Sequence, residues 1–158
     1  MNKGCTMDFI RGKKYCLRLL SIRPRTEYEV MARLRGKGYS GEMSDSIVTS
    51  LKNDGVINDL NFSIDWIDSR IRYSPRGLKM IRMELERKGV PEIILEEALK
   101  VKSGDIDEKK MAEDMVRETL ENSRGASDAR LKNRIFQLLL RKGFDSGLAE
   151  EVINDAMK

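Results

Sequence analysis

Apolar residues recur every three to four positions along most of the chain, which is the spacing that places them on one face of a helix. The first such run covers residues 8–22 and ends at Arg23-Pro24, where the proline breaks the pattern. Thr26 and Glu29 follow with the spacing of a capping box, which predicts that a second helix begins there. The same pattern continues to the C-terminus and predicts nine helices and no strand, so we expect an all-α fold.

The predicted helices fall into three groups of three, and local signals mark where several of them begin. Asn58 or Asp59 is predicted to cap the fourth helix, and Ser127 or Asp128 is predicted to cap the eighth. At the fifth helix, Ser74 is the predicted cap and Pro75 the predicted first helical residue. The expected organisation is a frayed, disordered N-terminal segment followed by three tandem three-helix repeats, at residues 1–7, 8–57, 58–104 and 105–158.

One short phrase begins at Leu34, at Leu85 and at Leu139: a leucine, three residues, a glycine and then a large apolar residue. The glycines of the three copies lie 51 and then 54 residues apart, which indicates a tandem repeat of one unit. A glycine just past a helix end supplies the left-handed conformation that closes the last turn, and the apolar residue after it packs back on the leucine. The predicted pairs are Leu34 with Tyr39, Leu85 with Val90, and Leu139 with Phe144.

The first copy of this phrase also matches a nucleotide-binding motif. Gly36, Gly38 and Gly41 have the spacing of the dinucleotide fingerprint, which requires a strand before it and a helix after it. A helix precedes this copy, and the other two copies lack the first and last glycines. The pattern therefore favours a helix stop, and no P-loop is present that would indicate ATP hydrolysis.

The chain contains no histidine, which removes Ser-His and Cys-His nucleophiles, the usual zinc sites and the commonest general base. Cys5 and Cys16 are best interpreted as structural thiols. The acidic pairs Glu96-Glu97 and Asp107-Glu108 are typical of solvated helix ends. We expect no cofactor, no metal and no enzymatic activity. An enzyme using carboxylates alone is the remaining catalytic alternative, and it predicts a buried Asp or Glu pair in a pocket.

Charge is distributed unevenly along the chain, although the net charge is only +4. Residues 1–37 carry a net charge of +7, residues 61–89 a net of +3, and residues 90–129 a net of −5. The basic half favours an anionic partner, and a merely solvated helical surface is the alternative. The N-terminus has no apolar signal segment and no run is long enough for a membrane span, so we expect a cytoplasmic protein.

Basic residues gather near the joint between the first two helices of the first and second repeats. The basic residues of the repeated phrase itself are explained by helix-dipole complementarity, but the group from Arg70 to Arg82 is denser than capping requires. Trp66, one turn before Arg70, is placed either to stack on a base or to join the core. The residues expected to contact a partner are Arg18, Arg23, Arg25, Arg70, Arg72, Arg76, Lys79 and Arg82.

Several stretches of this chain resemble the RecX family, the bacterial regulators of the RecA recombinase. They occur in the order of that family and cover residues 15–157. They are Leu17-Arg18-Leu19-Leu20 with Arg23-Pro24-Arg25-Thr26, Leu34 through Tyr39, Leu51 through Asp59, Phe62 with Trp66-Ile67-Asp68-Ser69-Arg70, Met83 through Val90, and Leu139 through Phe144.

The resemblance implies tandem right-handed three-helix modules in an elongated, curved array. It also implies docking in the groove of the RecA–DNA filament, some affinity for DNA, and inhibition of RecA's ATPase, strand-exchange and SOS coprotease activities, which would modulate recombination and DNA repair. We expect a monomer. The alternative function is a tri-helical, helix-turn-helix-like module that acts directly on nucleic acid. Tight binding to naked duplex DNA would favour that alternative.

Overall fold

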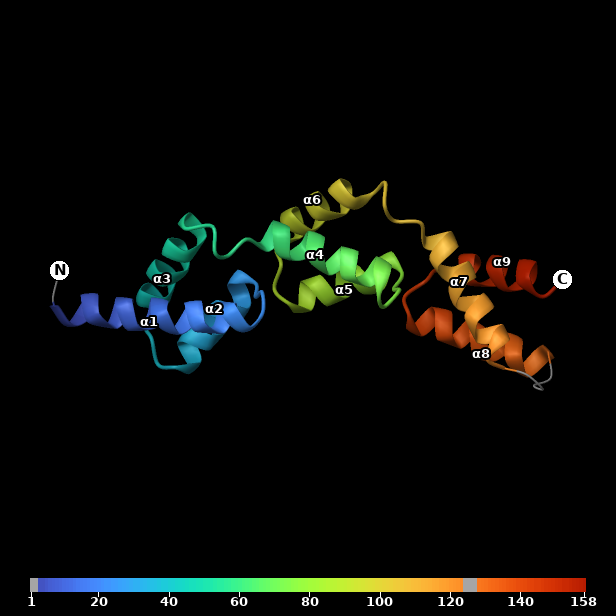
Figure 1. The fold of residues 1–158 in the computed structure, drawn as a ribbon, viewed down its shortest axis with the longest axis horizontal. Coiled ribbons are helices and arrows are strands. Elements are labelled where there is room, and N and C mark those ends of the chain that lie inside the picture. Colours follow the sequence, from blue (N-terminus) through green and yellow to red (C-terminus); the bar gives the residue numbers. More distant parts are fainter. Residues whose placement is uncertain (1–2, 124–127) are drawn as a thin grey trace. The chain divides into compact units, whose positions relative to one another are not determined.

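A computed structural model of the chain describes the backbone of residues 3–123 and 128–158, with side chains from residue 6 onward. Within these residues the chain forms nine α-helices and no strand, which confirms the predicted all-α class (Figure 1). The helices are α1 (Lys3–Ile22), α2 (Glu27–Gly36), α3 (Gly41–Asn53), α4 (Asp59–Arg72), α5 (Leu78–Arg87), α6 (Glu92–Lys102), α7 (Glu108–Glu121), α8 (Asp128–Arg141) and α9 (Ser146–Ala156).

Two predicted helix starts differ from the structure, and a third is only partly tested. Helix α1 begins at Lys3, so residues 3–7 are helical rather than frayed, and nothing in their sequence interrupts propagation of the helix. Helix α5 begins at Leu78 and not at the proline after Ser74; the carbonyl of Gly77 accepts its first hydrogen bonds, from the amides of Met80 and Ile81. Helix α8 begins at Asp128, which excludes Asp128 as its cap, and the other predicted cap, Ser127, lies outside the described residues.

The chain divides into two compact units. Unit 1 comprises Met1–Asp65 and Leu85–Ala98, and unit 2 comprises Trp66–Glu84 and Leu99–Lys158. Helices α4, α5 and α6 each contribute residues to both units. The predicted repeat boundaries after residues 57 and 104 fall between helices, and they stay a prediction.

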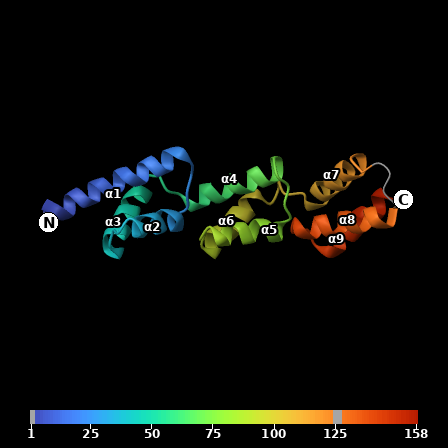
Figure 2. The same ribbon diagram turned by 90° about the horizontal axis from the view of Figure 1, so that it is seen from below.

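The core of unit 1 is built by α1, α2 and α3, which lie beside one another in Figures 1 and 2. Their amphipathic stripes meet in one cluster of buried side chains that includes Cys16, Val30, Leu34, Ile47 and Leu51, none of which retains exposed surface. Full burial of each such side chain contributes about 1.5–3 kcal/mol, so these residues hold the three helices together.

The core of unit 2 is built by α7, α8 and α9, which are also mutual neighbours in Figures 1 and 2. Val116, Ile135, Leu139 and Ile153 are among its fully or almost fully buried members. Ile71, from the end of α4, packs against the same cluster. This contact fixes the C-terminal part of α4, which carries several of the predicted basic residues, against the core of unit 2.

The repeated glycine phrase ends α2, α5 and α8 as predicted. Gly38, Gly89 and Gly143 have φ angles of 88°, 76° and 88°, in the left-handed region that glycine adopts without strain. In each copy the amide of the following apolar residue donates to the carbonyl of the leucine, at 3.2 Å for Tyr39, 3.1 Å for Val90 and 3.1 Å for Phe144. This is the six-to-one hydrogen bond of a Schellman motif, which confirms the helix-stop interpretation, while side-chain packing within the three predicted pairs stays a prediction.

A fourth helix ends in the same way without belonging to the predicted set. Gly55 has φ of 70°, and the amide of Val56 donates to the carbonyl of Leu51 at 2.9 Å. Val56 is 40% exposed, while the next residue, Ile57, is buried. Leu51, Gly55 and Val56 have the same spacing as the three predicted copies, so the sequence contains a fourth copy of the phrase that the prediction missed, with Asp54 in place of the lysine before the glycine.

Candidate functional site

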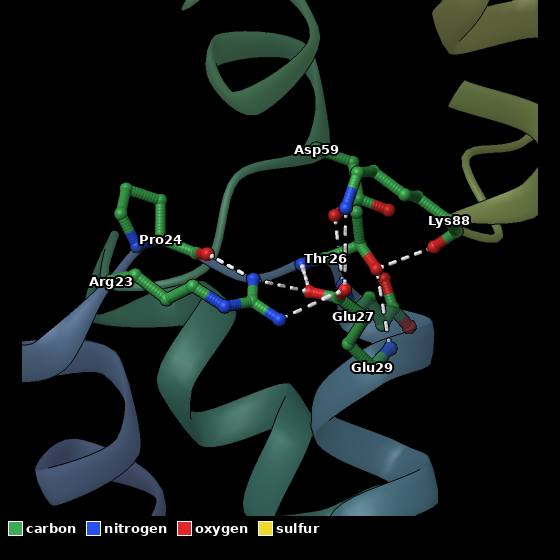
Figure 3. Close-up of polar contacts among 7 residues, drawn as sticks. All are labelled: Arg23, Pro24, Thr26, Glu27, Glu29, Asp59 and Lys88. Atoms are coloured by element: carbon green, nitrogen blue, oxygen red, sulfur yellow. Dashed lines mark hydrogen bonds and ion pairs between the residues drawn. The ribbon is translucent and has the colours of Figure 1, made fainter. Parts of the chain in front are cut away.

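Unit 1 contains a polar joint at the start of α2, shown in Figure 3. The Thr26 hydroxyl donates to the carbonyl of Lys88 at 2.6 Å, and the Glu27 amide donates to Asp59 Oδ1 at 2.8 Å (Figure 3). A Cβ on Gly89 would lie only 2.3 Å from Cβ of Tyr28, so the absence of a side chain there lets α2 approach. We call these contacts the first joint.

Unit 2 contains an equivalent joint at the start of α5. The Gly77 amide donates to the carbonyl of Lys142 at 2.9 Å, and the Leu78 amide donates to Glu108 Oε1 at 2.8 Å. A Cβ on Gly143 would lie 2.5 Å from Cβ of Met80 and 2.8 Å from its backbone nitrogen. We call these contacts the second joint.

The two joints share one chemical plan. Two hydrogen-bond donors lie at the start of each middle helix: the Thr26 hydroxyl and the Glu27 amide in the first joint, and the Gly77 and Leu78 amides in the second. The amide of the first helical residue has no acceptor within its own helix. A carboxylate on the first residue of a later helix, Asp59 or Glu108, accepts that amide. A backbone carbonyl at the residue before a phrase glycine, Lys88 or Lys142, accepts the other donor. The phrase predicted as a helix stop is therefore also a docking surface.

At the first joint the surroundings shift the pKa values of two carboxyl groups, Glu29 and Asp59, in opposite directions. Burial opposes ionisation of Glu29, but the hydrogen bond from Arg23 and the positive charges of Lys88 and Arg23 outweigh it and lower the pKa of Glu29. Burial raises the pKa of Asp59, and the amide of Glu27 only partly offsets that effect. Asp59 is the kind of buried carboxylate that a carboxylate enzyme would need, but its Oδ1 is engaged in capping α2.

A cluster of cations surrounds one carboxylate in unit 2. Arg70 Nε lies 2.6 Å from Glu84 Oε2 and Arg76 Nε lies 3.7 Å from Glu84 Oε1, with all three side chains no more than 23% exposed. Trp66 Nε1 also donates to Glu84 Oε2, at 2.8 Å, and the Arg70 guanidinium lies 4.5 Å from the centroid of the indole ring. Trp66, Arg70, Arg76 and Glu84, together with Lys142, form what we call the Glu84 cluster.

Lys142 belongs to this cluster by its electrostatics. Burial lowers the pKa of Lys142, and the positive charges of Arg76 and Arg70 lower it further. The two arginines that pair with Glu84 thus also act on Lys142. The cluster carries a local excess of positive charge in a partly desolvated setting, where a charge acts more strongly than it does in bulk water.

The structure places the eight predicted partner residues in four kinds of setting. Arg70 and Arg76 meet at Glu84, and Arg23 pairs with Glu29 through two hydrogen bonds of 3.0 and 3.2 Å. Arg25 and Arg82 are half-buried. Like Arg23, the remaining three are exposed: Arg18 on α1, Arg72 at the end of α4 and Lys79 in the first turn of α5. Partner contact by any of the eight stays a prediction.

Sequence reasoning missed Glu84 and Lys142 as members of a charged cluster. Glu84 follows Trp66 by 18 residues, and Lys142 lies just after the end of α8, so no local spacing links them. The one sequence feature that pointed to Lys142 was the lysine before the glycine in each of the three predicted copies of the phrase. That lysine had been explained by its favourable interaction with the helix dipole, so it was not assigned to a charged cluster. Trp66 stands half-buried, with its indole N–H bonded to Glu84, rather than in the core.

The described residues offer little basis for metal chemistry or membrane insertion. They contain no group of three or more His, Cys, Asp or Glu side chains able to hold a metal ion. None of the helices in this part of the chain is both long and apolar enough to cross a bilayer. The arrangement instead provides surfaces for binding.

Comparisons with known proteins agree with this arrangement. Residues 13–51 match the family model of the first three-helix domain of RecX, and residues 58–99 match that of the second. The regulatory protein RecX of Amycolatopsis mediterranei is 32% identical over 153 residues, which cover 94% of this chain and 84% of the relative. RecX of Mycolicibacterium smegmatis is 30% identical over 151 residues, which cover 91% and 78%.

Solved structures show the same fold. The crystal structure of RecX from Lactobacillus salivarius matches with a TM-score of 0.81 and 25% identity over 95% of this chain and 97% of that one. A second crystal structure of a regulatory protein RecX matches with a TM-score of 0.79 at 21% identity, over 96% of this chain and 74% of that one. Since relatives at 30–32% identity span about nine-tenths of the sequence, the chain belongs to the RecX family of regulatory proteins.

Proposed function

We propose that this chain binds the RecA recombinase on DNA and inhibits its ATPase, strand-exchange and SOS coprotease activities, and so modulates recombination and repair. RecX proteins are regulators and not enzymes, and the proposal follows from membership of that family over nearly the whole chain. It requires binding surfaces only, without a reactive centre. We further propose that binding takes place in the groove of the RecA filament.

The Glu84 cluster is the structural observation that carries the proposal. Arg70 and Arg76 share the carboxylate of Glu84, and their positive charges act on Lys142, so an anionic group from a partner would relieve the repulsion among the three cations. An arginine that is already held in place loses less side-chain freedom when it binds a carboxylate or a phosphate. A filament of protein on DNA offers both of these anions, which suits a surface of this charge.

The exposed cations Arg72 and Lys79 are better test positions than the buried ones. Reversing Arg70 or Arg76 to glutamate would place like charges beside Glu84 and disturb folding together with binding. Arg72 and Lys79 lie at the end of α4 and the start of α5, and both are exposed. Their replacement changes the charge of the surface and leaves the Glu84 cluster assembled.

The experiment is a titration of RecA's ATPase on single-stranded DNA with the Arg72→Glu/Lys79→Glu double variant. We expect at least a tenfold rise in the concentration needed for half inhibition. The matched control is Lys100→Glu/Lys110→Glu, which makes the same charge change at exposed positions of α6 and α7. Equal inhibition by the wild type and the folded test variant would refute this surface. An absence of inhibition by the wild type would refute the RecA proposal itself.

Direct action on nucleic acid is the second candidate function, and the exposed cations around the start of α5 favour it. Phosphate contacts would make the affinity for naked duplex DNA fall steeply as salt is added. A salt series on duplex DNA without RecA separates the two functions. Tight binding that discriminates between sequences would support the alternative, whereas weak binding without sequence preference is what a filament regulator requires.

A further inference from the structure

Helix α1 carries large apolar side chains on its solvent-facing side as well as on its buried side. Cys16 belongs to the core of unit 1, whereas Met7, Ile10 and Leu17 are 50%, 53% and 42% exposed. The spacing of these three residues places them in one stripe along the helix. Single exposed apolar residues are common on protein surfaces, but a row of them on one helix face is typical of a surface that binds another protein.

The exposed charges of α1 are mostly basic. Between residues 6 and 22 the exposed charged side chains are those of Asp8, Arg11, Lys14 and Arg18. Arg18 follows Arg11 by seven residues with Lys14 between them, so three positive charges lie along about 10 Å of the helix. We call the exposed apolar and cationic residues of α1 the basic face: Met7, Ile10, Arg11, Lys14, Leu17 and Arg18.

Helix α6 has an exposed face of the opposite charge. Ile93 is 79% exposed, and the exposed carboxylates of Glu92, Glu96 and Glu97 lie around it on the same helix. Glu97 follows Glu92 by five residues, so these three negative charges lie along about 8 Å of the helix. Lys100, one turn further along, adds one positive charge. We call Glu92, Ile93, Glu96 and Glu97 the acidic face, and all four belong to unit 1.

We propose that the basic face of one copy of this chain binds the acidic face of a second copy. Three cations face three carboxylates over similar lengths of helix, and each face also has exposed apolar surface. Both faces are exposed within the same unit, so neither covers the other in one molecule. Each copy therefore offers both halves of the contact. The proposal is independent of RecA binding, and it replaces the expectation of a monomer.

The mixture of apolar and charged residues identifies the kind of occupant. A nucleic-acid backbone would satisfy the cations of the basic face, but its phosphates offer nothing for Ile10 and Leu17 to pack against. A helix with carboxylates around an exposed isoleucine meets both requirements, and α6 is such a helix. A contact between one helix face and another is smaller than a standard protein interface, so we expect weak and reversible association.

Sedimentation velocity of the full-length protein at low ionic strength, without RecA or DNA, tests the proposal. We expect the weight-average sedimentation coefficient of the wild type to rise with concentration. Arg11→Glu/Lys14→Glu and Glu96→Lys/Glu97→Lys should each stay monomeric, because the two faces of either variant have the same sign of charge. A mixture of these two variants should associate again, because each face then meets a face of opposite charge on the other variant.

Two matched controls reverse exposed charges of unit 1 outside both faces. They are Arg33→Glu/Arg35→Glu on α2 and Glu42→Lys/Asp45→Lys on α3, and each should associate like the wild type. Ile93→Gln leaves every charge in place and should weaken association, because it removes the apolar part of the acidic face. Circular dichroism establishes that every variant is folded.

Three results would overturn the proposal. One is a wild-type sedimentation coefficient that is constant at all concentrations. Another is a mixture of the two charge-reversed variants that stays monomeric. The third is a monomeric wild type whose inhibition of RecA is lost in Arg11→Glu/Lys14→Glu, which would identify RecA as the occupant of the basic face.

Discussion

Alanine substitution at the four left-handed glycines separates the two roles of the glycine phrase. Gly38, Gly55, Gly89 and Gly143 all have positive φ, so alanine is strained at each of them. Only Gly89 and Gly143 also face a docked helix. The series therefore contains its own controls. The cost of placing alanine in a left-handed conformation is common to all four positions, whereas a clash of the new Cβ with a docked helix arises only at Gly89 and Gly143.

The magnitudes follow from the geometry. A left-handed conformation costs an L-residue about 1–2 kcal/mol, which is the whole effect expected at Gly38 and Gly55, where the added Cβ meets nothing within 4 Å. At Gly89 the added Cβ would lie 2.3 Å from Tyr28 Cβ, and at Gly143 it would lie 2.8 Å from the Met80 nitrogen. Overpacking of this kind adds about 1–3 kcal/mol, which brings the expected loss to about 2–5 kcal/mol at these two positions.

Urea denaturation followed by far-ultraviolet circular dichroism measures the loss of unfolding free energy for each variant. Gly143→Ala should be the most destabilised, because its new Cβ meets backbone atoms that cannot rotate away. Equal losses at all four positions would show that the joints are not close-packed contacts, and the docking role of the phrase would then be wrong.

Three further outcomes are expected. Asp59→Asn keeps an acceptor for the Glu27 amide and removes a buried carboxylate, whose pKa is raised by burial. The unfolding free energy of this variant should therefore exceed that of the wild type at neutral pH. The difference should vanish as the pH falls through the pKa of Asp59, because the wild-type side chain then becomes neutral as well. Glu84→Gln should lower the unfolding free energy by about 1–3 kcal/mol and tighten binding to DNA at low salt. Burial raises the pKa of Cys16 from 9.0 to about 11 and leaves its side chain no exposed surface. In a Cys5→Ser background the native thiol should therefore be alkylated at pH 8 at least about a hundredfold more slowly than in the unfolded chain.

Each of these three outcomes has a contradicting result. A stability difference between Asp59→Asn and the wild type that does not change with pH would mean that Asp59 titrates normally. Weaker DNA binding by folded Glu84→Gln would mean that the carboxylate itself contacts the partner. Equal alkylation rates for native and unfolded protein would mean that Cys16 is accessible.

Features encoded by neighbouring residues were predictable from the sequence. The helix ends at Gly38, Gly89 and Gly143 depend on a glycine, a leucine and one apolar residue within six positions. The capping box of Thr26 and Glu29 is equally local, and the structure contains it. In both cases the backbone geometry requires particular residue types at fixed spacing, so that the pattern alone determines the conformation.

Features that depend on distant partners were not predictable. Ser74-Pro75 has the local signal of a helix start, but α5 begins at Leu78, where the amides of Gly77 and Leu78 bond to Lys142 and Glu108. Tertiary hydrogen bonds thus decided where the helix begins. The Glu84 cluster was not predictable for the same reason. Arg70 and Arg76 were recognised as part of a basic group, but nothing in the local sequence identifies Glu84 as the carboxylate that they share.

The joints have a consequence for how such chains change in length during evolution. Every polar contact in the two joints uses a backbone group on at least one side. The middle repeat contributes to both joints: Asp59, Lys88 and Gly89 form the accepting side of the first joint, and Gly77 and Leu78 provide the donors of the second. A duplication that copies one whole repeat therefore delivers both halves in a single step. The number of repeats can grow or shrink by one without the need for a new complementary surface to arise by mutation.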